Sequence, residues 1–276
     1  MNQTGVVSLH ELVRENDVKR LEECLGQLDE SSDAVNARDA GGDTPLHVAV
    51  AANNVPLIRL LKKCGADLHA RNKKSASCVV VATHAGDCDL VKELLSLGAF
   101  ANDTDALGNS LANIAAIRGD IAMLGTLQES RANFLSRNYD DGTIPIMNAI
   151  LNQRDEAFHF LKSLDVDPKV FHINRTRAGK TALHLAVELE YQPALDFFLA
   201  LPIAAKLVNE ADEEGESPVH QAARAAQQHL LLRLKEAGAD LSHANKNGQT
   251  AADVAQSSAL KQLLQAPPPS VDPSVT

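Results

Sequence analysis

The chain has 276 residues, of which 45% are hydrophobic and 22% charged, and its formal net charge at pH 7 is −10. This composition excludes a chain that is disordered throughout, and the acidic balance disfavours nucleic acid and anionic membranes as partners. No apolar run approaches the roughly 18 residues that span a bilayer, and the first residues lack a secretory signal. We therefore expect an intracellular protein, cytoplasmic or nuclear, with no membrane span.

A helix pair is predicted near the amino terminus, within residues 8–30. The run Leu9-His10-Glu11-Leu12 and the apolar residues between Val18 and Leu25 both follow helical spacing. This pair lacks the turn that opens each of the later units. We expect it to cap the amino-terminal end of a repeat array, where a polar outer face is needed.

The next segment, residues 39–71, is predicted to form a turn, a short helix, a second turn and a second helix. Gly42 lies in a turn where glycine adopts a positive φ most easily, and the Thr44 hydroxyl is placed to cap a helix. Pro45 fits the first helical position, and the apolar residues between Leu57 and Leu61 form one face of the second helix. Neither helix can bury its face alone, which indicates stacking against neighbouring units.

The unit repeats along the chain. The pairs Gly65-Ala66, Gly98-Ala99 and Arg131-Ala132 follow one another at intervals of 33 residues, and a fixed period of this length is typical of stacked repeats. The hexapeptide Thr44-Pro45-Leu46-His47-Val48-Ala49 resembles the signature of the ankyrin repeat family and recurs at 181–186 and 217–222. Weaker copies stand at 77–82, 110–115, 144–149 and 250–255.

The resemblance implies an all-α fold, an ankyrin-repeat solenoid of stacked helix-turn-helix units with β-hairpin-like loops. The expected domain covers 1–265, with capping helices at 8–30 and repeats near 39–71, 72–104, 105–138, 139–175, 176–211, 212–244 and 245–265. Extra residues near Asp165–Thr176 and Pro202–Ala211 predict longer hairpin loops there. The Pro-rich segment 266–276 is expected to be a disordered tail.

No residue pattern points to catalysis, a cofactor or a metal. His47, His184 and His220 occupy one signature position, where in the ankyrin family the ring typically bonds turn backbone near its own repeat. The sequence contains no phosphate-binding loop, no nucleophile elbow and no HExxH spacing, and the four cysteines lack a CxxC pair. We therefore expect a non-enzymatic chain with reduced cysteines, without cofactor or metal.

The resemblance also implies a partner surface, because ankyrin arrays commonly bind proteins with the hairpin tips and the exposed end of the first helix, which line a concave face. Residues that would ordinarily be polar on this face are apolar at four positions, Leu107, Ile117, Leu151 and Leu189. Tyr139 replaces the usual Asp at a repeat start. The predicted partner-binding residues are Lys73, Lys74, Leu107, Asn109, Ile117, Arg118, Tyr139, Asp140, Leu151, Arg177, Lys180, Glu188 and Leu189. Basic residues at 71–74 and acidic residues at 212–216 flank the apolar centre.

The sequence therefore predicts a monomeric, non-catalytic scaffold or adaptor that binds a protein or peptide on this face. Three alternatives remain open. The chain is a targeting or regulatory segment of a larger enzyme, channel or pathogen effector; the central insertions hide a catalytic site; or the exposed apolar residues reflect drift and pack against the hairpins. The sequence does not identify the partner.

Overall fold

The structure is a computed structural model that describes residues 8–27 and 33–265. The chain divides into two compact units, Met1–Asp140 and Asp141–Thr276, which we call unit 1 and unit 2. The expectation of a disordered tail at 266–276 lies outside the described residues, as do the last residues of the predicted capping segment.

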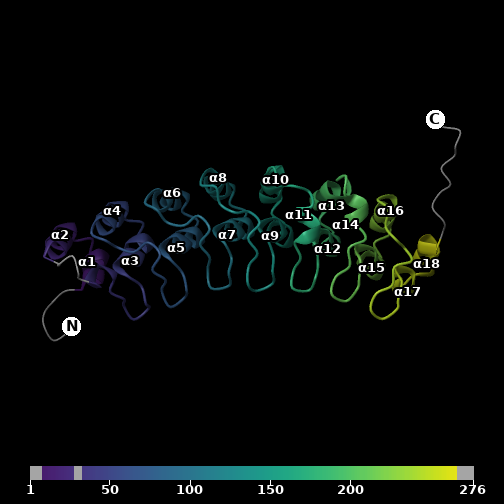
Figure 1. Ribbon diagram of the computed structural model, residues 1–276, viewed down its shortest axis with the longest axis horizontal. Coiled ribbons are helices and arrows are strands. Elements are labelled where there is room, and N and C mark those ends of the chain that lie inside the picture. The colour runs from purple at the N-terminus through teal and green to yellow at the C-terminus, as the bar shows by residue number, and fades with distance from the viewer. Residues whose placement is uncertain (1–7, 28–32, 266–276) are drawn as a thin grey trace. The chain divides into compact units, whose positions relative to one another are not determined.

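The described residues of unit 1 form four helix pairs and the hairpin loops between them. The pairs are α1 (Leu9–Arg14) with α2 (Val18–Gly26), α3 (Pro45–Ala51) with α4 (Val55–Lys63), α5 (Cys78–Ala85) with α6 (Cys88–Ser96), and α7 (Leu111–Arg118) with α8 (Ile121–Glu129). A one-turn helix η1 (Asp33–Asn36) precedes the first hairpin. Within this unit the first helices form one row and the second helices another, and the hairpins extend on the side of the first row (Figure 1).

The first full unit shows why these residues form these elements. The Thr44 hydroxyl accepts a hydrogen bond from the His47 amide at 3.4 Å, and Pro45 occupies the first turn of α3. Gly42 closes the preceding turn with a φ of +77°, a conformation that costs an L side chain about 1–2 kcal/mol. Leu57 and Leu61 of α4 are fully buried between the two helix rows. The predicted turn, cap and apolar face are all observed.

Unit 2 contains three further pairs and the end of the array. Its helices are α9 (Pro145–Leu151), α10 (Asp155–Ser163), α11 (Val170–Ile173), α12 (Ala182–Glu188), α13 (Gln192–Leu199), α14 (Ala204–Leu207), α15 (Pro218–Arg224), α16 (Gln228–Glu236), α17 (Ala251–Val254) and α18 (Ser258–Gln265). With the isolated antiparallel bridges Thr104–Ser110 and Ala244–Thr250, the helix pairs confirm the predicted all-α fold with β-hairpin-like loops.

The central insertions take a form that the sequence did not indicate. We expected longer hairpin loops, but the extra residues form the short helices α11 and α14, which follow the second helix of their repeats. Phe171 of α11 packs edge-on against Phe197 and Phe198 of α13, with ring centroids 5.6 and 5.4 Å apart. Aromatic burial of this kind extends the core, so the first insertion contributes to packing.

The described part of the chain has no helix that is both long enough and apolar enough to cross a bilayer.

Candidate functional site

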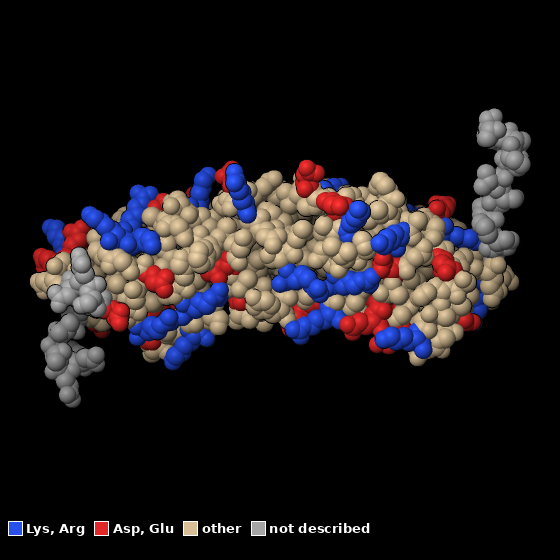
Figure 2. Space-filling model, viewed as in Figure 1, with Lys and Arg blue, Asp and Glu red and all other residues tan. Residues whose placement is uncertain are grey.

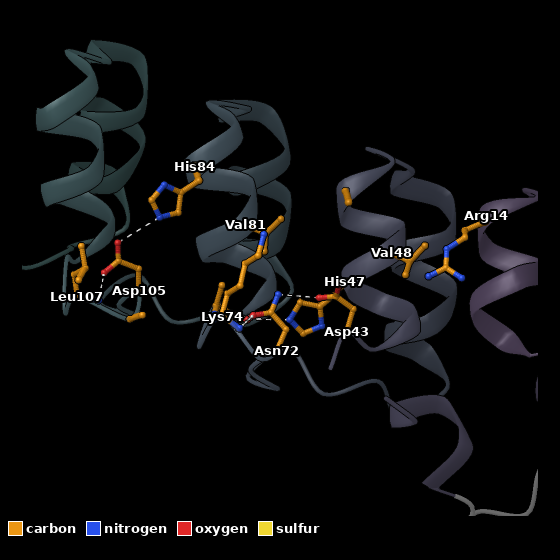
Figure 3. A pocket seen from close by; sticks show the side chains of 13 residues that line it. Arg14, Asp43, His47, Val48, Asn72, Lys74, Val81, His84, Asp105 and Leu107 are labelled. Atoms are coloured by element: carbon orange, nitrogen blue, oxygen red, sulfur yellow. Dashed lines mark hydrogen bonds and ion pairs between the residues drawn. The ribbon is translucent and has the colours of Figure 1, made fainter. Parts of the chain in front are cut away.

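One hollow of unit 1 lies on the face formed by the first helices and the hairpin tips, which we call the first-helix face. Its volume is about 640 Å3. Val48 and Ala51 of α3 and Val81 of α5 supply apolar surface, and Leu107 of the hairpin 105–108 closes one end with its side chain 54% exposed. Arg14 and Leu107 lie at opposite ends in Figure 3, with Lys74 between them.

The two carboxylates of this hollow bond to the chain's own hairpins. Asp105 accepts hydrogen bonds from the backbone amides of Leu107 and Asn109, both at 2.9 Å, and its other oxygen lies 3.4 Å from His84 Nε2. Asp43 accepts a 2.8 Å bond from the side-chain amide of Asn72. These carboxylates therefore hold the tips in shape.

An arginine fixes the spacing of two of these hairpins. Arg71 donates 2.6 Å hydrogen bonds to the carbonyls of Ser75, in its own hairpin, and of Thr104, just before the next one. The same guanidinium is paired with Asp103, whose side chain is only 8% exposed. The fork geometry of arginine allows these simultaneous bonds, which tie neighbouring tips together.

The signature histidines link successive repeats. The Nε2 atoms of His47, His184 and His220 lie 3.1, 3.1 and 3.0 Å from the carbonyls of Ala76, Glu216 and Gln249, respectively, each in the next hairpin. Each Nδ1 atom bonds the residue that caps its own helix. The expected structural role is therefore observed, with one ring nitrogen reaching the following repeat.

The bonding of His184 requires the neutral ring. The amide of Thr181 donates to Nδ1 at 3.2 Å, so Nδ1 carries no proton, and Nε2 must donate to the carbonyl of Glu216. Burial lowers the pKa of His184 to about 4, and burial also lowers the pKa values of His47 and His220. These neutral rings hold successive repeats together through hydrogen bonds, and they are not placed to transfer protons at neutral pH.

Unit 2 has a hollow of about 650 Å3 on its own first-helix face. Lys180 and Glu188, which line it, form a 2.7 Å ion pair, and Arg224 is paired with Glu216. Figure 2 shows acidic and basic side chains side by side along the hairpin edge of this unit. The predicted Lys180 and Glu188 are therefore brought together, within a surface of mixed charge.

Most of the predicted partner-binding residues are accessible. Tyr139 and Leu151 have 65% and 37% of their surfaces exposed, whereas Ile117 and Leu189 are only partly exposed. The charged residues that are exposed are Lys73, Lys74, Arg118, Asp140, Arg177 and Glu188.

The structure corrects the prediction that Asn109 contacts a partner. Asn109 is only 7% exposed, and its side chain donates to Asp105 at 3.1 Å and accepts from Asn138 at 3.1 Å. These bonds stabilise the hairpin, so Asn109 does not offer its side chain to a partner.

The sequence prediction missed several residues of the unit 1 hollow. Arg14 comes from the capping pair, which was assigned only a terminal role. Val48 and Val81 stand 33 residues apart at the same repeat position, so the period itself could have identified them. Among the described residues, no group of three or more His, Cys, Asp or Glu side chains is arranged to hold a metal ion.

Comparison with known proteins agrees with the observed repeat fold. The family model described as "Ankyrin repeat" matches residues 41–73. NF-kappa-B inhibitor zeta of Bos taurus is 30% identical over 254 residues, which are 78% of this chain and 35% of that protein. The Notch-regulated ankyrin repeat-containing protein of Xenopus tropicalis is 30% identical over 94 residues, covering 34% of this chain and 82% of that protein.

Among solved structures, the ankyrin repeat domain of Bcl-3, described as a unique member of the IkappaB protein family, matches with a TM-score of 0.68. The two sequences are 25% identical, and the match covers 82% of this chain and 99% of that domain. The chain spans about a third of the length of the NF-kappa-B inhibitor zeta proteins that it matches.

Proposed function

This chain belongs to the ankyrin repeat family, and from that premise we propose that it is a non-catalytic scaffold or adaptor that binds a partner protein or peptide on its first-helix face. The assignment of residues 1–265 to one repeat domain and the monomeric, intracellular state are parts of this proposal. The name of NF-kappa-B inhibitor zeta describes that protein as an inhibitor of another protein, and this supports protein binding in general.

The observation that carries the proposal is the hollow of unit 1. It offers apolar surface from Val48, Ala51 and Val81 beside the exposed side chain of Leu107. Exposed apolar residues in a hollow with a polar rim are characteristic of interaction sites, where one or two anchors carry most of the binding energy. A side chain such as Leu107, at the mouth of the hollow, is placed to act as an anchor.

The test is affinity capture from a cell lysate on the immobilised wild-type chain and on a variant carrying Leu107→Asp and Leu151→Asp. Leu232→Asp is the matched control, because Leu232 is 39% exposed but belongs to α16, a second helix. We expect a protein that the wild type and the control retain and that the double variant loses. Equal retention by all three chains contradicts the proposal, provided that circular dichroism shows equal helix content.

A second function is favoured by one observation. The chain spans about a third of the length of the NF-kappa-B inhibitor zeta proteins, so similar repeats also occur as one part of longer polypeptides. In that case the chain serves as the targeting or regulatory segment of a larger protein. A transcript that continues the reading frame past Thr276 supports this function, and a stop codon directly after Thr276 opposes it.

A further inference from the structure

We propose that the hollow of unit 1 binds an extended peptide segment in which an apolar residue lies near aspartate or glutamate side chains. This inference rests on the proposed function and names the chemistry of the partner. It depends on which polar groups in the hollow are already bonded and which remain available.

Both carboxylates in the hollow already accept hydrogen bonds from the chain itself. Asp105 accepts hydrogen bonds from two backbone amides and from the side-chain amide of Asn109. Asp43 accepts one from the side-chain amide of Asn72. Outside the hollow, Asp39 accepts hydrogen bonds from two backbone amides of its own hairpin and from the guanidinium of Arg14. A lysine or arginine of a basic peptide would have to compete with these internal hydrogen bonds.

The lysine ammonium groups at the hollow, in contrast, are available to a ligand. Lys74 lines the hollow and Lys73 precedes it at the same hairpin tip, and both residues are exposed. Their backbone amides are bonded, to Asn72 Oδ1 and to the carbonyl of Gly41, at 3.0 Å each. In the described part of the chain, however, no carboxylate lies within 4.0 Å of either ammonium group.

The wider surface agrees with this pattern. Arg14, at the far end of the hollow, pairs with Asp39 through Nη2 alone, and its side chain is 53% exposed. Figure 2 shows lysine and arginine side chains gathered along the edge where the first hairpins of unit 1 lie, although the chain as a whole is acidic. The charge complementarity of this local surface therefore favours carboxylates, which would gain the unpaired ammonium groups as partners.

The dimensions favour an extended occupant. The hollow reaches from Arg14 on α1 to Leu107 before α7 and thus crosses three helix spacings. Packed helices lie about 8–10 Å apart, which gives a length of about 24–30 Å. An extended chain advances about 3.3 Å per residue, so a peptide of about eight residues covers the hollow. Leu107 and Val81, which lie one helix spacing apart, would contact its apolar side chain.

The experiment is selection of random nine-residue peptides, displayed on phage, against the full wild-type chain. Selected peptides are synthesised with a fluorescent label, and their affinities are measured by anisotropy. Three variants are compared with the wild type: Leu107→Asp, the charge reversal Lys73→Glu with Lys74→Glu, and the matched reversal Lys62→Glu with Lys63→Glu at the end of α4. Circular dichroism verifies that each variant is folded.

We expect peptides whose binding depends on Leu107 to be enriched in aspartate and glutamate beside an apolar residue. The reversal at Lys73 and Lys74 should weaken them about tenfold or more, as should replacement of their acidic residues by the corresponding amides, while the reversal at 62 and 63 should have little effect. Peptides that depend on Leu107 but show no acidic enrichment, or that bind the Lys73, Lys74 variant normally, overturn this inference and leave the proposed function intact. Failure to select any peptide that depends on Leu107 also overturns this inference, whereas the proposed function is contradicted only by equal retention of the partner in the affinity capture.

Discussion

The backbone amide of Tyr139 donates a 2.8 Å hydrogen bond to the carbonyl of Leu107, so two residues of successive hairpins, both in unit 1, are joined directly. The contact is close because Gly108 has no side chain: a Cβ atom built there would lie 2.3 Å from Cγ of the Tyr139 ring. The exposed side chains of Leu107 and Tyr139 are thereby held at neighbouring tips.

This contact predicts unequal costs for two glycine substitutions. Gly108 and Gly248 hold the same hairpin position with φ values of +76° and +74°, but a Cβ at Gly248 would meet nothing within 4 Å. Both Gly→Ala changes should lower the free energy of unfolding by about 1–2 kcal/mol because of the left-handed backbone. Gly108→Ala should lower it further, because the new Cβ displaces Tyr139. Urea unfolding should therefore show a clearly larger loss for Gly108→Ala, and equal losses would contradict the close contact.

Arg71 should contribute more to stability than another paired arginine of unit 1. Arg71→Ala removes the donors for the carbonyls of Ser75 and Thr104 and leaves the buried Asp103 without its ion partner, at a cost of about 1–3 kcal/mol. Arg59 is the control, since its ion pair with Glu93 lies on the surface of α4 and α6. The urea midpoint should fall markedly for Arg71→Ala and little for Arg59→Ala. The reverse order would show that Arg71 does not tie the hairpins together.

The free energy of unfolding should decrease in mild acid because the buried histidines resist protonation. His184 has a pKa near 4 in the folded state and about 6.5 when unfolded, so its contribution is complete above pH 6.5. As the pH falls from 6.5 towards 4, the unfolded chain binds a proton that the folded chain does not, and up to about 3 kcal/mol is lost. Melting temperatures should decrease through this range. His184→Gln should make the decrease shallower, whereas the exposed His229→Gln should leave it unchanged.

The two tyrosines should respond differently to loss of the hydroxyl. Tyr191 is 6% exposed and donates a 2.7 Å hydrogen bond to Asp155. Burial and this carboxylate raise the pKa of Tyr191. Tyr191→Phe should lower the free energy of unfolding by about 1 kcal/mol or more, because a hydrogen bond to a charged group is lost. Tyr139→Phe should change it little, since the exposed Tyr139 has access to water, and equal effects would count against the Tyr191 bond.

The fold could be predicted because each repeat carries its own local signals. Thr44, Pro45 and Gly42 act within a few residues of the chain, and the apolar face of α4 follows from helical spacing. The form of the insertions could not be predicted in this way. Whether residues 165–176 extend a hairpin or form α11 depends on Phe171 finding Phe197 and Phe198, which belong to the next repeat.

The candidate site was predicted only in part, for a similar reason. Lys74 and Leu107 were found because the position within a repeat determines which residues reach the first-helix face. Asn109 was misassigned because its burial depends on bonds to Asp105 and to Asn138 of the next hairpin. The availability of Lys74 likewise depends on the absence of a nearby carboxylate among the described residues, and sequence spacing does not reveal that.

The most direct test of the central claim is hydrogen–deuterium exchange of the full chain, alone and in complex with the partner that affinity capture retains. We predict that the partner slows exchange in the hairpins 39–43, 72–76 and 105–108 and in the first helices α3 and α5, which line the hollow. The second helices α4, α6 and α8 should exchange as they do in the free chain. Slowed exchange confined to those second helices would contradict the account, because it would place the partner away from the first-helix face.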